Sequence, residues 1–362
     1  MRETFTGQSS MLFFTFLLCF FFTGCEKPPA IQAINGAAQG TTYSVKYWLN
    51  NDNNIDNNFL KQEVDKELAR IDKLISNYRD DSVIEVFNQN HTANIPIILD
   101  KEILDLLIIS ADVHNKSKGC YDPTIKPLFQ IWGFSDDKLH IPDDKAIAQA
   151  KQSIGFADKL LRDNNSITKK VPTVTIDFSA IGQGYAVMKI ADLLNQQGIQ
   201  NYLVEIGGEM LVAGTKPENN PWRVGVEKPV PNSQKISEII TLGRQDADNA
   251  QDAGGKHNTA IMTSGTYRHY FDDNGTRYSH ILDPRTGKPV THDSVAVTVL
   301  LDNAAYADAW STALLCLGSQ EGLKVANDNA IPAIFYDMGS NQQLIRHTSR
   351  AVAEQHKNWT ID

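Results

Sequence analysis

The spacing of apolar side chains along the chain predicts a mixture of helices and strands. Residues 40–47 and 294–300 alternate apolar and polar positions, which is typical of a half-buried strand. Apolar residues instead recur every three or four positions in 60–75 and 179–197, which predicts amphipathic helices. Further elements are expected as helices at 82–87, 100–117 and 303–317, and as strands at 174–178, 201–206, 209–213 and 331–336.

These elements alternate without a regular strand-helix-strand repeat, so the sequence favours the α+β class over a doubly wound parallel sheet. The 362 residues are 41% hydrophobic and 21% charged, which is ordinary for a globular protein with a large core. We expect one large domain of two intimate lobes over residues 35–347, followed by a C-terminal tail at 348–362. A stretch at 244–258, rich in Gln, Asp, Asn, Ala and Gly, is expected to be a mobile surface insertion.

The stretch 263–290 concentrates more chemically capable side chains than any other part of the chain. Its pattern predicts a hairpin with one arm through 267–271, a turn at Asn274-Gly275 and a return arm through 277–282. A polar hairpin that simply faces solvent is the alternative. The side chains concerned are Arg268, His269, Arg277, His280, Asp283 and Arg285.

An irregular loop is expected at 119–134, because two prolines and two glycines lie close together there. The loop also carries large aromatic side chains. These either fill a gap in the core or form the wall of a ligand site.

Two carboxylates stand at positions suited to ligands. Asp177 ends a predicted strand just before a glycine-rich helix start, although it could equally cap that helix. Asp308, Ser311 and Thr312 share one helix face, and one carboxylate with hydroxyls suits Mg²⁺ when substrate phosphates supply its other ligands. The alternative is an Asp near a helix start with hydroxyls bonded to the backbone.

Net charge and cysteine content narrow the functional classes. The net charge of -9 argues against nucleic acid as the natural partner, since no basic stripe is present to neutralise phosphates. There is no CxxC motif and no His/Cys cluster, so a zinc or iron-sulfur site is not expected. Exported proteins can hold disulfides, but two cysteines as far apart as Cys120 and Cys316 do not establish one, and the apolar run around Cys316 favours a buried thiol.

The N-terminus has the features of an export signal. An apolar run at 11–22 is too short for a comfortable transmembrane helix, and small residues precede Cys25 as in a bacterial lipobox. We therefore expect a lipoprotein signal peptide at 1–24, lipidation of Cys25 and a tether at 25–34, with an uncleaved membrane anchor as the alternative. The protein would then sit on the periplasmic side of the bacterial cell membrane, held by its lipid.

Eight blocks of sequence, taken together and in order, resemble the ApbE family of FAD:protein FMN transferases. They cover nearly everything from about residue 35 to 340, and the ordered set is far more specific than any single block. The blocks are GTTYSV at 40–45, NYRDDSVIEVFN at 77–88, YDPTIKPLFQIWGF at 121–134, IDFSAIGQGYAV at 176–187, NYLVEIGGE at 201–209, TSGTYRHYF at 263–271, SHILDPRTGKPV at 279–290 and ADAWSTALLCLG at 307–318.

The resemblance implies an ApbE-like, T-fold-like α+β domain of mixed sheets with packed helices. It also implies an Mg²⁺-dependent enzyme that transfers FMN from FAD to a threonine hydroxyl of an acceptor protein and releases AMP. The implied metal ligands are Asp308, Thr312, Ser311 at a variable position and the backbone oxygen of Ala180. Three of the implied residues differ from those found in some relatives: Gln39 and Gln183 among the FAD contacts, and Ser311 among the metal ligands. The full set of implied FAD contacts is Gln39, Tyr78, Cys120, Tyr121, Asp122, Asp177, Gln183 and Ile281.

His280 is the best-placed neutral side chain to take the proton of the incoming threonine, or else it orients the acceptor. Asp283 and Arg285 would support His280 or position the acceptor. The family's usual acceptors are flavinylated subunits of sodium-pumping NADH:quinone reductase and Rnf-type complexes. Two other functions are compatible with these features. One is a hydrolase that converts FAD to FMN and AMP, and the other is a flavin-binding lipoprotein without activity.

Overall fold

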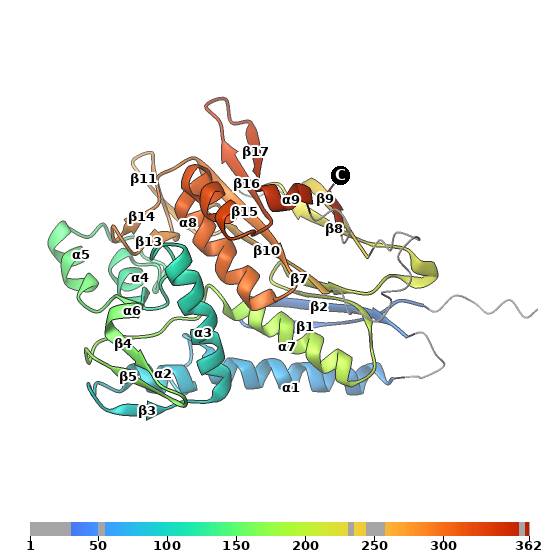
Figure 1. Ribbon diagram of the computed structural model, residues 1–362, viewed down its shortest axis with the longest axis horizontal. Coiled ribbons are helices and arrows are strands. Elements are labelled where there is room, and N and C mark those ends of the chain that lie inside the picture. The colour runs from blue at the N-terminus through green and yellow to red at the C-terminus, as the bar shows by residue number, and fades with distance from the viewer. Residues whose placement is uncertain (1–29, 50–54, 231–234, 244–257, 355–358, 362) are drawn as a thin grey trace, which may run out of the picture.

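The computed structural model describes residues 30–49, 55–230, 235–243, 258–354 and 359–361 (Figure 1). The signal peptide, Cys25 and nearly all of the insertion predicted at 244–258 lie outside these ranges. Within them, every helix is too short or too polar to cross a membrane.

One eight-stranded sheet forms the centre of the molecule, and all its strand pairings are antiparallel. The α+β class is confirmed, although we expected mixed strand directions. In sheet order the strands are β1 (Gln32–Ala38), β2 (Thr41–Trp48), β6 (Asn201–Ile206), β7 (Glu209–Ala213), β10 (Asn258–Gly265), β15 (Ser294–Leu301), β16 (Ala333–Met338) and β17 (Leu344–Thr348).

Three helices cover one face of this sheet and bury the main core against it (Figure 1). They are α1 (Asn57–Ile75), α7 (Gly182–Gln196) and α8 (Ala304–Asp328). The predicted apolar stripe of α1 is confirmed, since its members are buried in this core. These are Leu60, Val64, Leu68, Ile71 and Ile75.

Helix α8 begins where the sequence predicts and continues further than expected. The Asn303 side chain caps it by accepting a hydrogen bond from Tyr306 N at 2.9 Å. At Gly318 the backbone adopts a φ of 69°, which glycine reaches at little cost. The chain therefore changes direction there and resumes helix to Asp328, instead of ending at 317.

The opposite face of the sheet is covered by a second, smaller sheet and the C-terminal segment. Strand β18 (Trp359–Ile361) pairs with β9 (Ile236–Leu242), and β9 pairs with β8 (Trp222–Glu227). Trp359 is buried there, as is Val352 of α9 (Arg350–Glu354). The described part of the expected tail thus packs as part of the domain.

The second lobe gathers beside the helical layer at the left of Figure 1, where α3 packs against α8. Three short strands there form the sheet β3-β5-β4. The elements of this lobe are α2 (Val83–Gln89), β3 (Pro96–Ile98), α3 (Lys101–Lys116), α4 (Lys126–Trp132), α5 (Asp144–Lys151), α6 (Phe156–Lys159), β4 (Leu160–Arg162) and β5 (Ser166–Lys169).

The remaining strands are β11 (Tyr270–Asp273), β12 (Thr276–Ser279), β13 (Leu282–Asp283) and β14 (Lys288–Pro289), and Pro217–Asn219 forms one turn of 3-10 helix.

Helix α4 corrects the expectation of an irregular loop throughout 119–134. Pro127 lies in the first turn of α4, where a missing N–H removes no helical hydrogen bond. The aromatic side chains serve both roles left open by the sequence. Trp132 is buried in a small core, while Phe129 lines a cavity.

The segment 174–178 forms no regular secondary structure and has no strand partner, so it is not the strand we predicted. Two asparagine side chains take the place of a neighbouring strand. Asn88 accepts from Ile176 N at 2.7 Å and donates to Ile176 O at 2.9 Å, while Asn77 accepts from Phe178 N at 2.9 Å. These bonds fix the backbone just before the start of α7.

Replacing Asn88 by Ala is expected to lower the free energy of unfolding by about 1–3 kcal/mol, because it leaves the buried N–H of Ile176 without a partner, while Ile176 O keeps its bond from Asn77 Nδ2. Urea denaturation measures the loss. Asn164→Ala, at an exposed position, is the matched control and should change the midpoint little. Equal midpoints for Asn88→Ala and wild type would show that these bonds do not stabilise the segment.

Candidate active site

A cavity lies where the loop before α4, the start of α7, helix α8 and the hairpin segment meet. It brings together most of the site residues predicted from the sequence. Lining it are six predicted FAD contacts, three predicted metal ligands and the predicted base: Cys120, Tyr121, Asp122, Asp177, Gln183, Ile281, Ala180, Asp308, Thr312 and His280.

The other two predicted FAD contacts, Gln39 and Tyr78, line a neighbouring cavity. Ser179 and Gln183 line both cavities, so the two are adjacent. Tyr78 is 90% exposed, which places it at the open edge. An elongated ligand such as a dinucleotide could therefore extend from one cavity into the other.

Asp308 is a buried carboxylate on the cavity wall. Its Oδ2 accepts a hydrogen bond from Gly184 N at 2.8 Å, so the start of α7 is bonded to this carboxylate. A Cβ at Gly184 would lie 2.4 Å from Ala304 O, so only glycine lets α7 approach α8 this closely. Burial raises the pKa of Asp308, although the bond to Gly184 opposes the shift.

The two hydroxyls that follow Asp308 have different surroundings. Thr312 lines the cavity, and its Oγ1 lies 3.0 Å from Ser264 Oγ. Ser311 is fully buried, donates to Asp308 O at 2.8 Å and does not line the cavity. The predicted spacing thus brings Asp308 and Thr312 to the site, while the Ser311 hydroxyl bonds back to the backbone.

Two further charged residues line this cavity: Glu209, which sequence reasoning missed, and Arg268, which it named in the 263–290 stretch without a site role. Glu209 is buried at the start of β7, and its Oε2 accepts from Thr263 N at 3.0 Å. Burial raises the pKa of this carboxyl, and so does the nearby charge of Asp308. The sequence feature that could have identified Glu209 is a carboxylate at the start of an apolar strand, directly after Gly207-Gly208.

Asp177 lines the cavity as predicted. It neither ends a strand nor caps a helix, which were the two local roles expected from the sequence. Its Oδ1 accepts from Ser179 N at 2.8 Å, which forms a tight turn, and its own N donates to Pro123 O at 2.7 Å. The cap position of α7 is instead Ile181, whose side chain makes no capping bond. Burial raises the pKa of the Asp177 carboxyl.

Asp122 holds the loop before α4 in its bend. Its Oδ1 accepts from Thr124 N at 2.8 Å, and its Oδ2 accepts from Phe156 N at 3.1 Å. The neighbouring Tyr121 presents its carbonyl oxygen to Nδ1 of His114 at 2.8 Å. The loop is therefore fixed in place beside the cavity.

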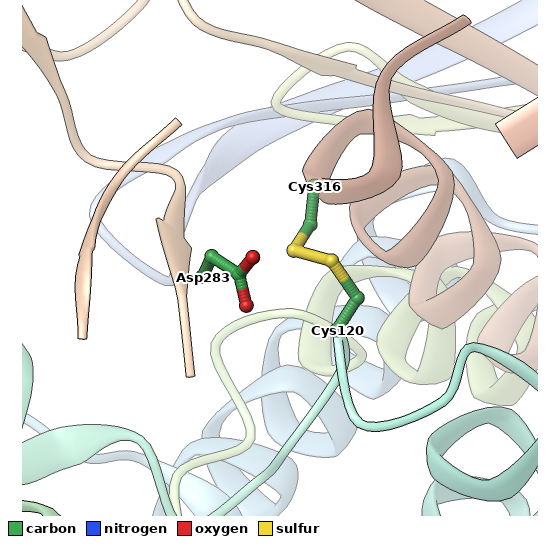
Figure 2. A group of neighbouring side chains, drawn as sticks. All are labelled: Cys120, Asp283 and Cys316. Carbon is green, nitrogen blue, oxygen red and sulfur yellow. A yellow bond between two sulfur atoms is a disulfide. The ribbon is translucent and has the colours of Figure 1, made fainter. Parts of the chain in front are cut away.

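Cys120 and Cys316 form a disulfide, which corrects the expectation of a buried thiol (Figure 2). Their Cα atoms are 5.9 Å apart across 196 residues of sequence. The bond ties the loop before α4 to α8, one turn beyond Thr312. Asp283 lies beside it, but disulfide sulfurs are not thiolate ligands, so this group is not a metal site.

Removing this disulfide with the double substitution Cys120→Ser and Cys316→Ser is expected to lower the free energy of unfolding by about 2–4 kcal/mol. The loss arises because a cross-link over so long a stretch restricts the unfolded chain. Urea denaturation with and without dithiothreitol measures it. Reductant should bring the wild type to the midpoint of the double variant and leave that variant unchanged; identical midpoints without reductant would contradict the prediction.

The predicted hairpin is confirmed as β11 and β12, joined through Asn274-Gly275. His280 follows β12 and is held by the carbonyl oxygen of His269, which accepts from His280 N at 3.1 Å. Nδ1 of His280 lies 2.8 Å from the same oxygen. A carbonyl oxygen only accepts, so Nδ1 carries the proton and Nε2 keeps its lone pair. Burial lowers the pKa of His280 to about 4, helped by the charge of Arg268.

Asp283 and Arg285 form an ion pair next to the disulfide and do not line the cavity. Arg285 Nε and Nη2 donate to the two oxygens of Asp283, at 3.0 Å in each case. Arg285 Nη1 also lies 3.5 Å from Glu321 of α8. The pair thus connects the segment after the hairpin to α8.

Comparison with known proteins identifies relatives over most of the chain. Residues 39–335 match the ApbE family. An FAD:protein FMN transferase of Vibrio cholerae is 36% identical over 313 residues, which is 86% of this chain and 89% of the relative. Another, of Haemophilus influenzae, is 31% identical and covers 90% of this chain and 92% of its own length. The structure of the Vibrio cholerae flavin transferase ApbE superimposes with a TM-score of 0.78 at 32% identity, over 90% of this chain and 99% of that one. The apo flavinyl transferase ApbE of Pseudomonas stutzeri superimposes with a TM-score of 0.78 at 32% identity, over 91% of this chain and 98% of that one.

Proposed function

The chain belongs to the ApbE family of FAD:protein FMN transferases, and we propose that it transfers FMN from FAD to a threonine hydroxyl of an acceptor protein, with Mg²⁺ bound and AMP released. One observation carries the proposal. The oxygen ligands at Asp308 and Thr312, the neutral imidazole of His280 and six predicted FAD contacts line the same cavity.

The donor set fits a hard cation such as Mg²⁺. Asp308 is buried and forms no ion pair with any described residue, so its charge has no counterion from the protein. Thr312, with its hydroxyl, and Ala180, with its backbone carbonyl, line the same cavity and offer oxygen donors. These three residues would hold Mg²⁺, which when bound neutralises charge on the nonbridging oxygens of a pyrophosphate.

The proposed reaction is a displacement at the phosphorus on the FMN side of FAD. The threonine oxygen forms a bond to this phosphorus, and the bond to the bridging oxygen breaks. That oxygen leaves with AMP, and the threonine proton passes to a base. The products are an FMN phosphodiester on threonine and AMP, so no oxidant or reductant is required.

The residues of the chain divide this work. Nε2 of His280 accepts the proton of the threonine, because Nδ1 is already committed to the carbonyl oxygen of His269. Asp122 and the disulfide at Cys120 hold the loop that forms one cavity wall. The ion pair of Asp283 with Arg285 stabilises the segment that follows the hairpin. It thereby positions the acceptor without lining the cavity itself.

We further propose that Cys25 is lipidated after removal of residues 1–24, so that the enzyme works at the periplasmic side of the membrane. The N-terminal apolar run and the cysteine after small residues support this placement. The acceptor would then be an exported or outward-facing protein, such as the flavinylated subunits of sodium-pumping NADH:quinone reductase or Rnf-type complexes.

Mass spectrometry tests the proposal. The purified protein is incubated with FAD and Mg²⁺, with and without such a subunit fragment, and the fragment is searched for a threonine bearing FMN. Formation of the adduct together with AMP, lost on chelation, supports the transfer. AMP without acceptor and no adduct would identify a hydrolase, whereas FAD binding that survives chelation without AMP would identify a binding protein.

A further inference from the structure

Arg268 occupies a distinctive position in the cavity. It follows β10, and its Nη1 donates to Gly207 O at 3.0 Å, so the guanidinium lies over the turn between β6 and β7. The side chain remains exposed to solvent although it lines the cavity. A guanidinium has five N–H groups, so this bond leaves further donors available to a ligand in the cavity.

Arg268, Glu209 and His280 line the same cavity. The charge of Arg268 opposes the rise in the pKa of Glu209 that burial and the charge of Asp308 cause. It also adds to the lowering of the His280 pKa by burial. Arg268 is therefore close enough to act on both the carboxyl of Glu209 and the imidazole of His280.

The charge balance of the cavity points to an anionic ligand at this position. Among the described residues that line the cavity, Arg268 is the single Lys or Arg, beside the carboxylates of Asp122, Asp177, Glu209 and Asp308. A pyrophosphate adds two more negative charges. It would be repelled from this lining unless the metal and a cation of the protein met it.

We propose that Arg268 binds the pyrophosphate of FAD. Its planar guanidinium supplies paired N–H donors to nonbridging oxygens, as arginine does in other phosphate sites. The protein thereby neutralises phosphate charge in addition to a metal held at Asp308 and Thr312. The inference rests on the proposed function and adds a substrate-binding residue to it.

Binding measurements with three ligands test the inference. Arg268→Gln is titrated with FAD, ADP and riboflavin in the presence of Mg²⁺. We expect affinity for FAD and ADP to fall about 10- to 100-fold, because a charge-assisted contact to phosphate is lost, while riboflavin affinity stays within twofold. Unchanged FAD affinity, or an equal loss for FAD and riboflavin, would overturn the proposal.

The matched control is Arg277→Gln on the same hairpin. Arg277 pairs with Asp272 at 3.2 Å, stacks on Tyr270 and does not line the cavity. It should bind all three ligands as the wild type does. If Arg268→Gln does not fold, the double variant Arg268→Gln with Glu209→Gln also removes the buried carboxylate whose charge Arg268 offsets, and it gives the same comparison. Wild-type protein that binds no FAD would instead contradict the proposed function itself.

Discussion

Asp308→Asn is expected to reduce FMN transfer about 1,000-fold or more at any practical Mg²⁺ concentration. The substitution removes the one carboxylate among the proposed metal ligands, and a bound cation contributes several kcal/mol to such a reaction. The fold should persist, because an asparagine oxygen can still accept from Gly184 N. Single-turnover flavinylation of an acceptor fragment, followed over a series of Mg²⁺ concentrations, measures the effect.

Asp302→Asn is the matched control, since this exposed carboxylate lies just before α8 and outside the cavity. It should transfer FMN as the wild type does. Removing Mg²⁺ from the wild type with EDTA should reproduce the defect of Asp308→Asn, and adding EDTA to that variant should have little further effect. Wild-type rates in Asp308→Asn would show that Asp308 does not hold the metal.

The same variant has a second expected signature, in the stability of the metal-free protein. Burial raises the pKa of Asp308 in the folded state above its ordinary value of 3.8. The folded protein therefore binds this proton more tightly than the unfolded chain, and stability falls as pH rises from 3.8 through the raised value. Asp308→Asn lacks this loss. It should unfold at a higher temperature than metal-free wild type above that window, and the gap should close at lower pH.

Features encoded by neighbouring residues were predictable from the sequence. The stripe of α1 follows from apolar spacing, and the Asn303 cap follows from one side chain before a helix. Asn274-Gly275 adopts positive φ at both positions, which explains why that dipeptide indicates a hairpin. Asp308 and Thr312 were found for the same reason, since a spacing of four residues fixes a shared helix face.

Features that depend on distant partners were not predictable. Nothing near Cys120 indicates that Cys316 will lie beside it, because only the packing of α8 on the second lobe brings them together. The strand prediction at 174–178 failed similarly. The apolar alternation was correct, but the hydrogen-bond partners are side chains of Asn77 and Asn88. Glu209 escaped notice because only the fold brings it into the same cavity as Asp308.

His280→Asn is expected to lower the single-turnover rate of FMN transfer about 100- to 10,000-fold, the usual contribution of a general base. The asparagine amide can still donate to His269 O near the position of Nδ1, so the backbone after β12 should keep its place. FAD affinity should therefore stay within a few-fold. His91→Ala, at an exposed position on another element, serves as control.

The pH dependence separates a base from a merely structural histidine. Because burial lowers the pKa of His280 to about 4, the imidazole stays neutral well below the ordinary histidine value of 6.5. At saturating FAD and Mg²⁺, the rate of transfer in the wild type should fall as pH drops through about 4, and this acid limb should be absent from the residual rate of His280→Asn. The folded pKa is the lower one, so the wild type also loses stability as pH falls from 6.5 towards 4, and the variant should lose less. A variant that transfers FMN at the wild-type rate would remove His280 from the chemistry. A variant that is slow with an unchanged acid limb would assign the proton to another group.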